Sequence, residues 1–116
     1  MKKIKLSFLI LIYSFNVGAA FTEPEMSQLK EINENYMAKA IESRKNLNAA
    51  IKESIANLPN EKSNILKLHE IWNQATKIKC RLAILDSLNT DAEIASKYEC
   101  LANEYTAEAN FLNSTY

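Results

Sequence analysis

Residues that interrupt helices are almost missing from this chain: glycine occurs once and proline twice in 116 residues. The single glycine, Gly18, stands in an apolar N-terminal segment, so nearly all of the remaining chain lacks the residues that end helices and form tight turns. Hydrophobic residues make up 47% of the chain, which is enough to pack helices against one another. We therefore expect an all-α protein with few turns.

The first twenty residues have the features of a secretory signal peptide. The basic start Met1–Lys5 is followed by an almost uncharged run from Leu6 to Val17, and Gly18–Ala20 is a small-residue cleavage site. The apolar run is shorter than the roughly 20 residues that span a bilayer, which favours cleavage over a retained membrane anchor. We expect residues 1–20 to be removed and residues 21–116 to form one domain, periplasmic or secreted from a bacterium, without membrane contact.

The charge and the residue counts argue against several kinds of partner. Removing Lys2, Lys3 and Lys5 from the 14 basic residues leaves 11 against 14 acidic residues, a net charge of −3. Nucleic-acid-binding proteins usually carry a basic surface, so we expect no nucleic acid. One glycine cannot build a phosphate-binding loop, and two cysteines with one histidine fall short of a zinc site. We expect no cofactor and no metal.

The first helix is expected to be long. Thr22 and Glu25 form a capping-box pattern, and nothing breaks the helix for about 35 residues, until Leu58-Pro59. Its apolar residues recur at steps of seven and four on one face, which we expect to be buried: Leu29, Tyr36, Ala40, Leu47, Ile51 and Leu58.

Two shorter helices are expected to follow as an antiparallel hairpin. One runs from Asn60 or Ser63 to about Leu88, and the other from a capping box of Thr90 with Glu93 to about Asn113. The main apolar face of helix two comprises Leu68, Ile71, Trp72, Ala75, Ile78, Leu82 and Leu85. This helix is apolar on a second side as well, so we expect a neighbour on each side. The predicted fold is a three-helix antiparallel bundle.

The two cysteines, Cys80 and Cys100, stand ten residues on either side of Thr90. In an exported protein such a pair is most simply one disulfide, and two separate reduced thiols are the alternative. Residues equidistant from the turn of a helical hairpin lie opposite one another, which makes a bridge geometrically reasonable. Closing a loop of this length stabilises a fold by roughly 3 kcal/mol.

No group of residues points to catalysis. His69 is the only histidine and stands in mid-helix without a nucleophile pattern, so we interpret it as a partly exposed structural residue. Trp72 is expected to pack between helices one and two. From Leu82 to Tyr116 six acids stand against one base, Lys97. We expect Glu93, Glu104 and Glu108 to form an acidic face that steers a basic partner or serves as plain polar exterior.

The C-terminal half resembles a known family. Trp72, seven intervening residues, Cys80, and then Cys100-Leu101 are similar to the lysozyme-inhibitor LprI-type family of small exported bacterial proteins, as is the Leu-Asn motif at Leu47. The similarity covers Leu47 to Leu112. The resemblance implies a helical, disulfide-linked fold and a role as a lysozyme inhibitor. Many relatives carry arginine where this chain has Thr76 and Glu108.

Two functions are therefore predicted for a non-enzymatic binding protein. One is inhibition of a basic lysozyme through the acidic face. The other is that of a structural or adaptor module, which docks on an envelope or secretion component through the amphipathic first helix or pairs with itself as a homo-oligomer.

Overall fold

The computed structural model of this protein describes residues 23–115. The chain divides into two compact units, Met1–Lys30 and Glu31–Tyr116. The expected signal peptide and the expected capping residue Thr22 lie outside the described residues. Of the first unit, only the residues that begin the first helix are described.

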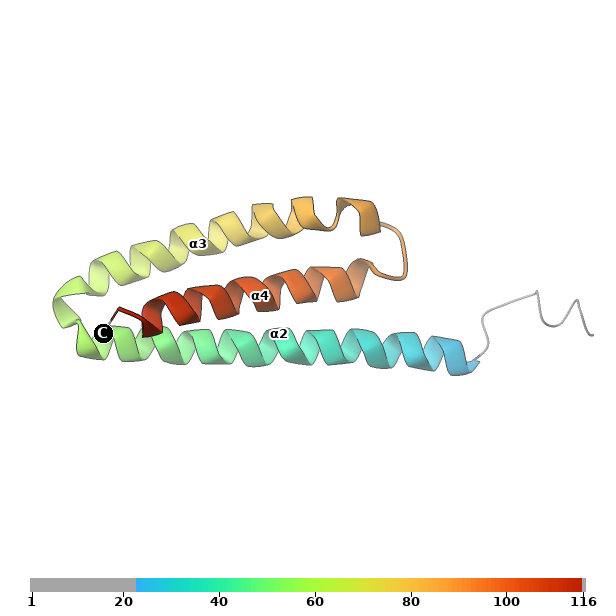
Figure 1. The fold of residues 1–116 in the computed structure, drawn as a ribbon, viewed down its shortest axis with the longest axis horizontal. Helices are drawn as coiled ribbons and strands as arrows, with labels where there is room; N and C mark the ends of the chain where they lie inside the picture. Colours follow the sequence, from blue (N-terminus) through green and yellow to red (C-terminus); the bar gives the residue numbers. More distant parts are fainter. Residues whose placement is uncertain (1–22, 116) are drawn as a thin grey trace, which may run out of the picture. The chain divides into compact units, whose positions relative to one another are not determined.

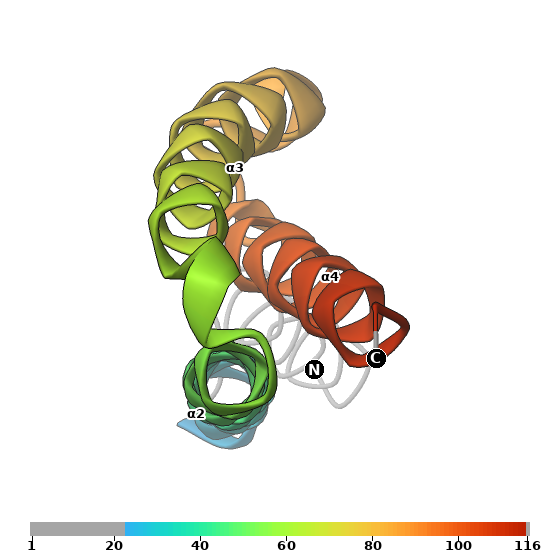
Figure 2. The ribbon, with the colours of Figure 1, turned by 90° about the vertical axis from the view of Figure 1, so that its left-hand side faces the viewer.

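The described residues form three α-helices: α2 Glu23–Asn57, α3 Lys62–Ala83 and α4 Glu93–Asn113. No strand occurs between residues 23 and 115. Within the unit Glu31–Tyr116, α3 and α4 form an antiparallel hairpin, and α4 lies alongside α2 (Figure 1). Viewed end-on, the three helices occupy the corners of a triangle (Figure 2). The predicted all-α, three-helix fold is confirmed.

The first turn is built around proline. Leu58 leaves the helical conformation (φ −128°, ψ 63°), and Pro59 opens a short 3₁₀ helix, Pro59–Glu61. A residue before proline is pushed out of the α region, and proline itself has no N–H to donate. Because the helix ends just before Leu58-Pro59, α2 has 35 residues, and the predicted length is confirmed.

The second turn differs from the prediction. α3 ends at Ala83 rather than at Leu88, and a 3₁₀ helix, Leu85–Ser87, follows. Asn89 then takes a left-handed conformation with φ 62°, which asparagine tolerates better than most residues. The expected capping box of Thr90 with Glu93 is wrong: the Thr90 hydroxyl donates to the Ser87 carbonyl at 2.6 Å and accepts from the Ala92 N–H at 3.2 Å.

The hydrophobic core is concentrated near the turn between α2 and α3. Leu47 and Ala50 of α2 are buried there with residues from the other two helices, Ile65, Ala109 and Leu112. The stripe predicted on α2 is thus confirmed at Ala40 and Leu47, which are 4% and 1% exposed. The opposite end of the hairpin is held by the bridge of Cys80 with Cys100.

The face of α3 that is buried is not the one we predicted. Ile71, Ile78 and Leu82 are 54%, 64% and 62% exposed, whereas Thr76 and Cys80 are 2% and 4% exposed. α4 packs on one side of α3, and among the described residues no second element covers the Ile78 side. The prediction of a neighbour on each side is therefore wrong for the described part of the chain.

Candidate functional site

The predicted disulfide is present. Cys80 on α3 and Cys100 on α4 are bonded, with their Cα atoms 5.5 Å apart, and the alternative of two free thiols is excluded. Leu101, the next residue, is half-buried at the same end of the hairpin. The bridge fixes the spacing of α3 and α4 at the end away from the main buried cluster around Leu47, next to the buried residues Ile84 and Ala102.

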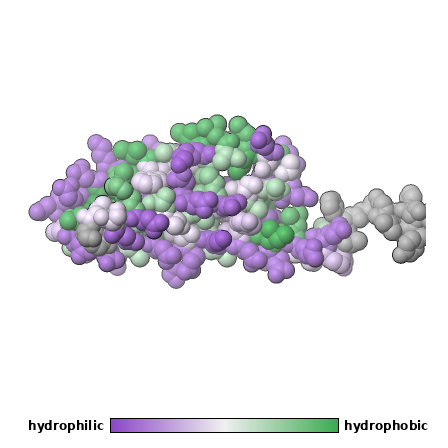
Figure 3. Space-filling model, viewed as in Figure 1, coloured by the Kyte–Doolittle hydropathy of each residue, from purple (hydrophilic) through white to green (hydrophobic). Residues whose placement is uncertain are grey.

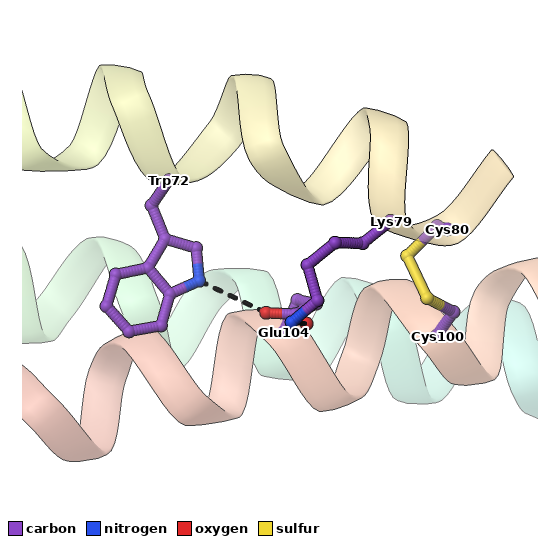
Figure 4. The surroundings of a disulfide bond; sticks show 5 residues. All are labelled: Trp72, Lys79, Cys80, Cys100 and Glu104. Atoms are coloured by element: carbon purple, nitrogen blue, oxygen red, sulfur yellow. Dashed lines mark hydrogen bonds and ion pairs between the residues drawn. A yellow bond between two sulfur atoms is a disulfide. The ribbon is translucent and has the colours of Figure 1, made fainter. Parts of the chain in front are cut away.

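Next to the disulfide lies a layer of polar contacts between α3 and α4 (Figure 4). The Trp72 indole N–H donates to Glu104 Oε2 at 3.2 Å, and Lys79 forms an ion pair with the other carboxylate oxygen. The Trp72 ring also lies 6.1 Å from the ring of Phe111, measured between centroids. Trp72 therefore packs between α3 and α4, and the prediction that it packs between helices one and two is wrong.

A second polar pair lies farther along the hairpin. His69 Nδ1 and Glu108 Oε2 share a hydrogen bond of 2.7 Å. His69 is partly exposed, as predicted, whereas Glu108 is 2% exposed. Burial raises the pKa of the Glu108 carboxyl above its ordinary value, against the opposing effect of the His69 hydrogen bond and charge.

These contacts change the predicted acidic face. Glu108 is buried, so its placement on an exposed face is wrong. The Glu104 side chain is 13% exposed and already paired with Lys79, which leaves it little freedom to meet a partner. Glu93 is half-buried and lines a groove. Other acids are exposed around the turn, where no ion pair to them occurs within the described residues: Asp86, Asp91 and Glu99.

The groove lies between α2, α3 and α4 at the disulfide end of the hairpin and has a volume of about 710 Å³. Its apolar walls come from all three helices and their ends, through Met37, Ile84, Ile94, Tyr98, Leu101 and Tyr105. A volume of this size lies within the range of pockets that hold ligands, roughly 300–1,000 Å³. The groove is therefore large enough to take up side chains of a partner.

Charged side chains border this groove. Lys77 and Arg81, one turn apart on α3, stand on one side, and Glu93 and Lys97, one turn apart on α4, stand on the other. None of the four has an ion-pair partner among the described residues. The Lys97 ammonium lies 5.8 Å from the centre of the Tyr98 ring.

The distribution of charge along the sequence contains one signal for this site. Five bases occur between Lys62 and Arg81 against the single acid Glu70, and two of these bases border the groove. The pairing of His69 with Glu108 had no signal, because the two residues are 39 positions apart and neither belongs to a local motif.

Two further observations concern membranes and metals. Among the described residues, none of the helices is both long and apolar enough to cross a membrane. The same residues contain no group of three or more histidine, cysteine or acidic side chains placed to hold a metal ion.

The comparisons with known proteins add no relative. No family model, no curated protein and no solved structure matches this chain. The likeness to the lysozyme-inhibitor LprI-type family therefore stays a prediction from the motifs around Trp72, Cys80 and Cys100.

Proposed function

We propose that this protein acts by binding a partner protein rather than by catalysis, and that the partner sits at the disulfide end of the hairpin. The observation that carries the proposal is the groove, because it combines apolar walls with charged side chains that lack partners within the described residues. A mostly apolar concave surface with a few polar groups at its edge is the usual form of a binding site. The disulfide keeps the groove open at a fixed width.

The partner we propose is a lysozyme, in keeping with the family resemblance. A lysozyme is expected to be strongly basic. Because three of the four charged residues at the groove are bases (Lys77, Arg81 and Lys97), we assign the attraction of a basic enzyme to the acids around the turn and only the apolar contact to the groove. The acids at this end of the hairpin are Glu93, which lines the groove, and Asp86, Asp91 and Glu99, which are exposed outside it. These residues replace Glu104 and Glu108, which are engaged inside the fold, as the acids that steer the partner. Attraction between exposed charges weakens as salt is added.

The test is lysozyme activity on a bacterial cell-wall substrate in the presence of the purified protein. We expect inhibition by the oxidised protein, weaker inhibition after reduction of the disulfide, and weaker inhibition at high salt. Asp91→Asn combined with Glu99→Gln should relieve inhibition several-fold, since long-range attraction mainly sets the association rate. The matched control is Glu42→Gln with Glu53→Gln, which removes the same charge from exposed positions on α2.

The pattern of outcomes separates the two parts of the proposal. Absence of inhibition with lysozymes of several types would rule out lysozyme as the partner. Ile94→Lys places a charge in the groove. If this variant still inhibits fully while the acid variants inhibit less, the partner binds at the turn and not in the groove.

A second function, that of an adaptor that pairs through α2, is favoured by exposed apolar residues on this helix. Ile32, Met37 and Ile41 are 47%, 37% and 67% exposed. A molecular mass that rises with protein concentration in sedimentation equilibrium, and that Ile41→Ser returns to the monomer value, would support self-pairing. A strict monomer would count against it.

A further inference from the structure

The side of α3 that faces away from α4 carries a line of exposed aliphatic residues, here termed the outer strip: Ile71, Ala75, Ile78 and Leu82. Residues at these spacings fall on one side of an α-helix, and they extend along the axis for about 16 Å at 1.5 Å per residue. The three large residues are between 54% and 64% exposed. Apolar surface gathers along the upper edge of the molecule over α3 (Figure 3).

Most charged side chains around the outer strip are basic, and the exposed acids Glu70 and Asp86 stand just outside its two ends. The segment from Ile71 to Leu85 contains no acidic residue, and its three charged residues are Lys77, Lys79 and Arg81. Lys67 lies in line with the strip, one turn before Ile71. Lys79 is paired with Glu104, whereas the other three bases have no ion-pair partner among the described residues. The surface is thus aliphatic along its centre and cationic along its edges.

The charges disfavour a second copy of this chain as the occupant. If the outer strips of two molecules packed together, the bases of one segment would face the bases of the other, with no acid in either segment to compensate. Like charges in contact are a standard means by which proteins reject a partner. The occupant must therefore be apolar at its surface and negatively charged at its edges.

The shape of the strip favours a flat occupant. The outer strip runs along a single helix as a ridge, and the groove between the helices is lined by other α3 residues: Asn73, Thr76, Lys77, Cys80 and Arg81. A helix that presents aliphatic side chains between lysine and arginine is typical of those that lie in a membrane interface, where the apolar side enters the bilayer and the bases meet anionic headgroups.

We propose that the outer strip of α3 docks on the surface of a bilayer that contains anionic lipid. From the sequence we expected no membrane contact once the signal peptide is removed, and the exposure of Ile71, Ile78 and Leu82 is the observation that changes this. Docking needs no membrane-spanning segment. The aliphatic residues of the strip do not line the groove, whereas Lys77 and Arg81 border both surfaces.

The experiment is co-sedimentation of the full chain with vesicles of phosphatidylcholine alone or mixed with phosphatidylglycerol. The strip variant is Ile78→Ser with Leu82→Ser, and its matched control is Met26→Ser with Leu66→Ser, which removes exposed apolar residues outside the strip. Every variant keeps the same N-terminal residues, so any contact of these residues with lipid is the same in the parent protein and in each variant. All four positions are exposed, so we expect the fold to be retained, which circular dichroism checks.

We expect binding to the phosphatidylglycerol vesicles that falls by at least about tenfold in the strip variant, because two aliphatic side chains no longer enter the bilayer. The control should stay within about twofold of the parent protein. Lys67→Gln should weaken binding to anionic vesicles by roughly fivefold and leave neutral vesicles unaffected.

Two results would overturn the proposal. One is equal partitioning of the parent protein and the strip variant onto anionic vesicles. The other is a dimer in sedimentation equilibrium that the strip variant dissociates, since this would make a second copy the occupant. Both results leave the proposed binding function of the groove intact, because its test uses residues outside the strip.

Discussion

The buried carboxyl of Glu108 makes the stability of this fold depend on pH. Burial raises its pKa, so the folded protein holds this proton at pH values where the unfolded chain has released it. The stability that protonated Glu108 contributes is complete below its ordinary pKa of 4.5 and is lost as pH rises through the raised value. Glu108→Gln cannot ionise, so we expect its free energy of unfolding to fall less than that of the parent protein over this range.

Urea unfolding followed by circular dichroism, from about pH 4 to about pH 8, measures this difference. Glu99→Gln, at an exposed position on the same helix, is the control and should follow the parent protein. If Glu108→Gln loses as much stability as the parent protein between these pH values, burial does not govern the protonation of Glu108.

At the scale of the elements, the hairpin of α3 and α4 depends on its disulfide. The bridge joins residues 20 positions apart at the end of the hairpin away from the main buried cluster around Leu47. We expect Cys80→Ala with Cys100→Ala to lower the free energy of unfolding by roughly 3 kcal/mol, because the unfolded chain regains the freedom that the closed loop removed.

Unfolding in urea with and without a reducing agent tests this prediction. Reduction should bring the parent protein close to the double variant, and it should leave the double variant unchanged. A parent protein that keeps its stability after complete reduction would show that the packing of α3 on α4 suffices without the bridge.

The elements also show where sequence patterns stop being informative. Pro59 predicted the first turn, because proline restricts the backbone of the residue before it. The two cysteines predicted the hairpin, because a disulfide requires their Cα atoms to lie close together. The prediction of the buried face of α3 was wrong. Ile71, Ile78 and Leu82 recur at the spacing expected of a core, but they are exposed. The buried face of α3 instead carries His69, Thr76 and Cys80. His69 and Cys80 pair with residues 39 and 20 positions away in the sequence.

At the scale of the whole unit, stability is distributed unevenly. The core around Leu47 and Leu112 joins α2 to the hairpin at one end, and the disulfide with the polar layer holds the other. We expect Leu112→Ala to lower the free energy of unfolding by about 3 kcal/mol, because a fully buried side chain leaves a cavity. Ile41→Ala, at a position 67% exposed, should change it by less than about 0.5 kcal/mol.

Thermal and urea unfolding of the two variants provide the measurement. Similar losses for Leu112→Ala and Ile41→Ala would mean that the end of the unit near Leu112 is not its stabilising core.

The candidate site was less predictable than the fold. The groove depends on how the three helices lie relative to one another, and no local pattern in the sequence contains this information.

The bridge of Cys80 with Cys100 also makes the intervening chain a closed covalent ring that contains the turn. A protease that cuts one peptide bond between Arg81 and Glu99 opens this ring but cannot divide the molecule. Such a nicked protein should migrate as one species in a denaturing gel without reductant and as two fragments with it. The exposed turn around Asn89 is therefore a place where this protein tolerates cleavage in a protease-rich environment.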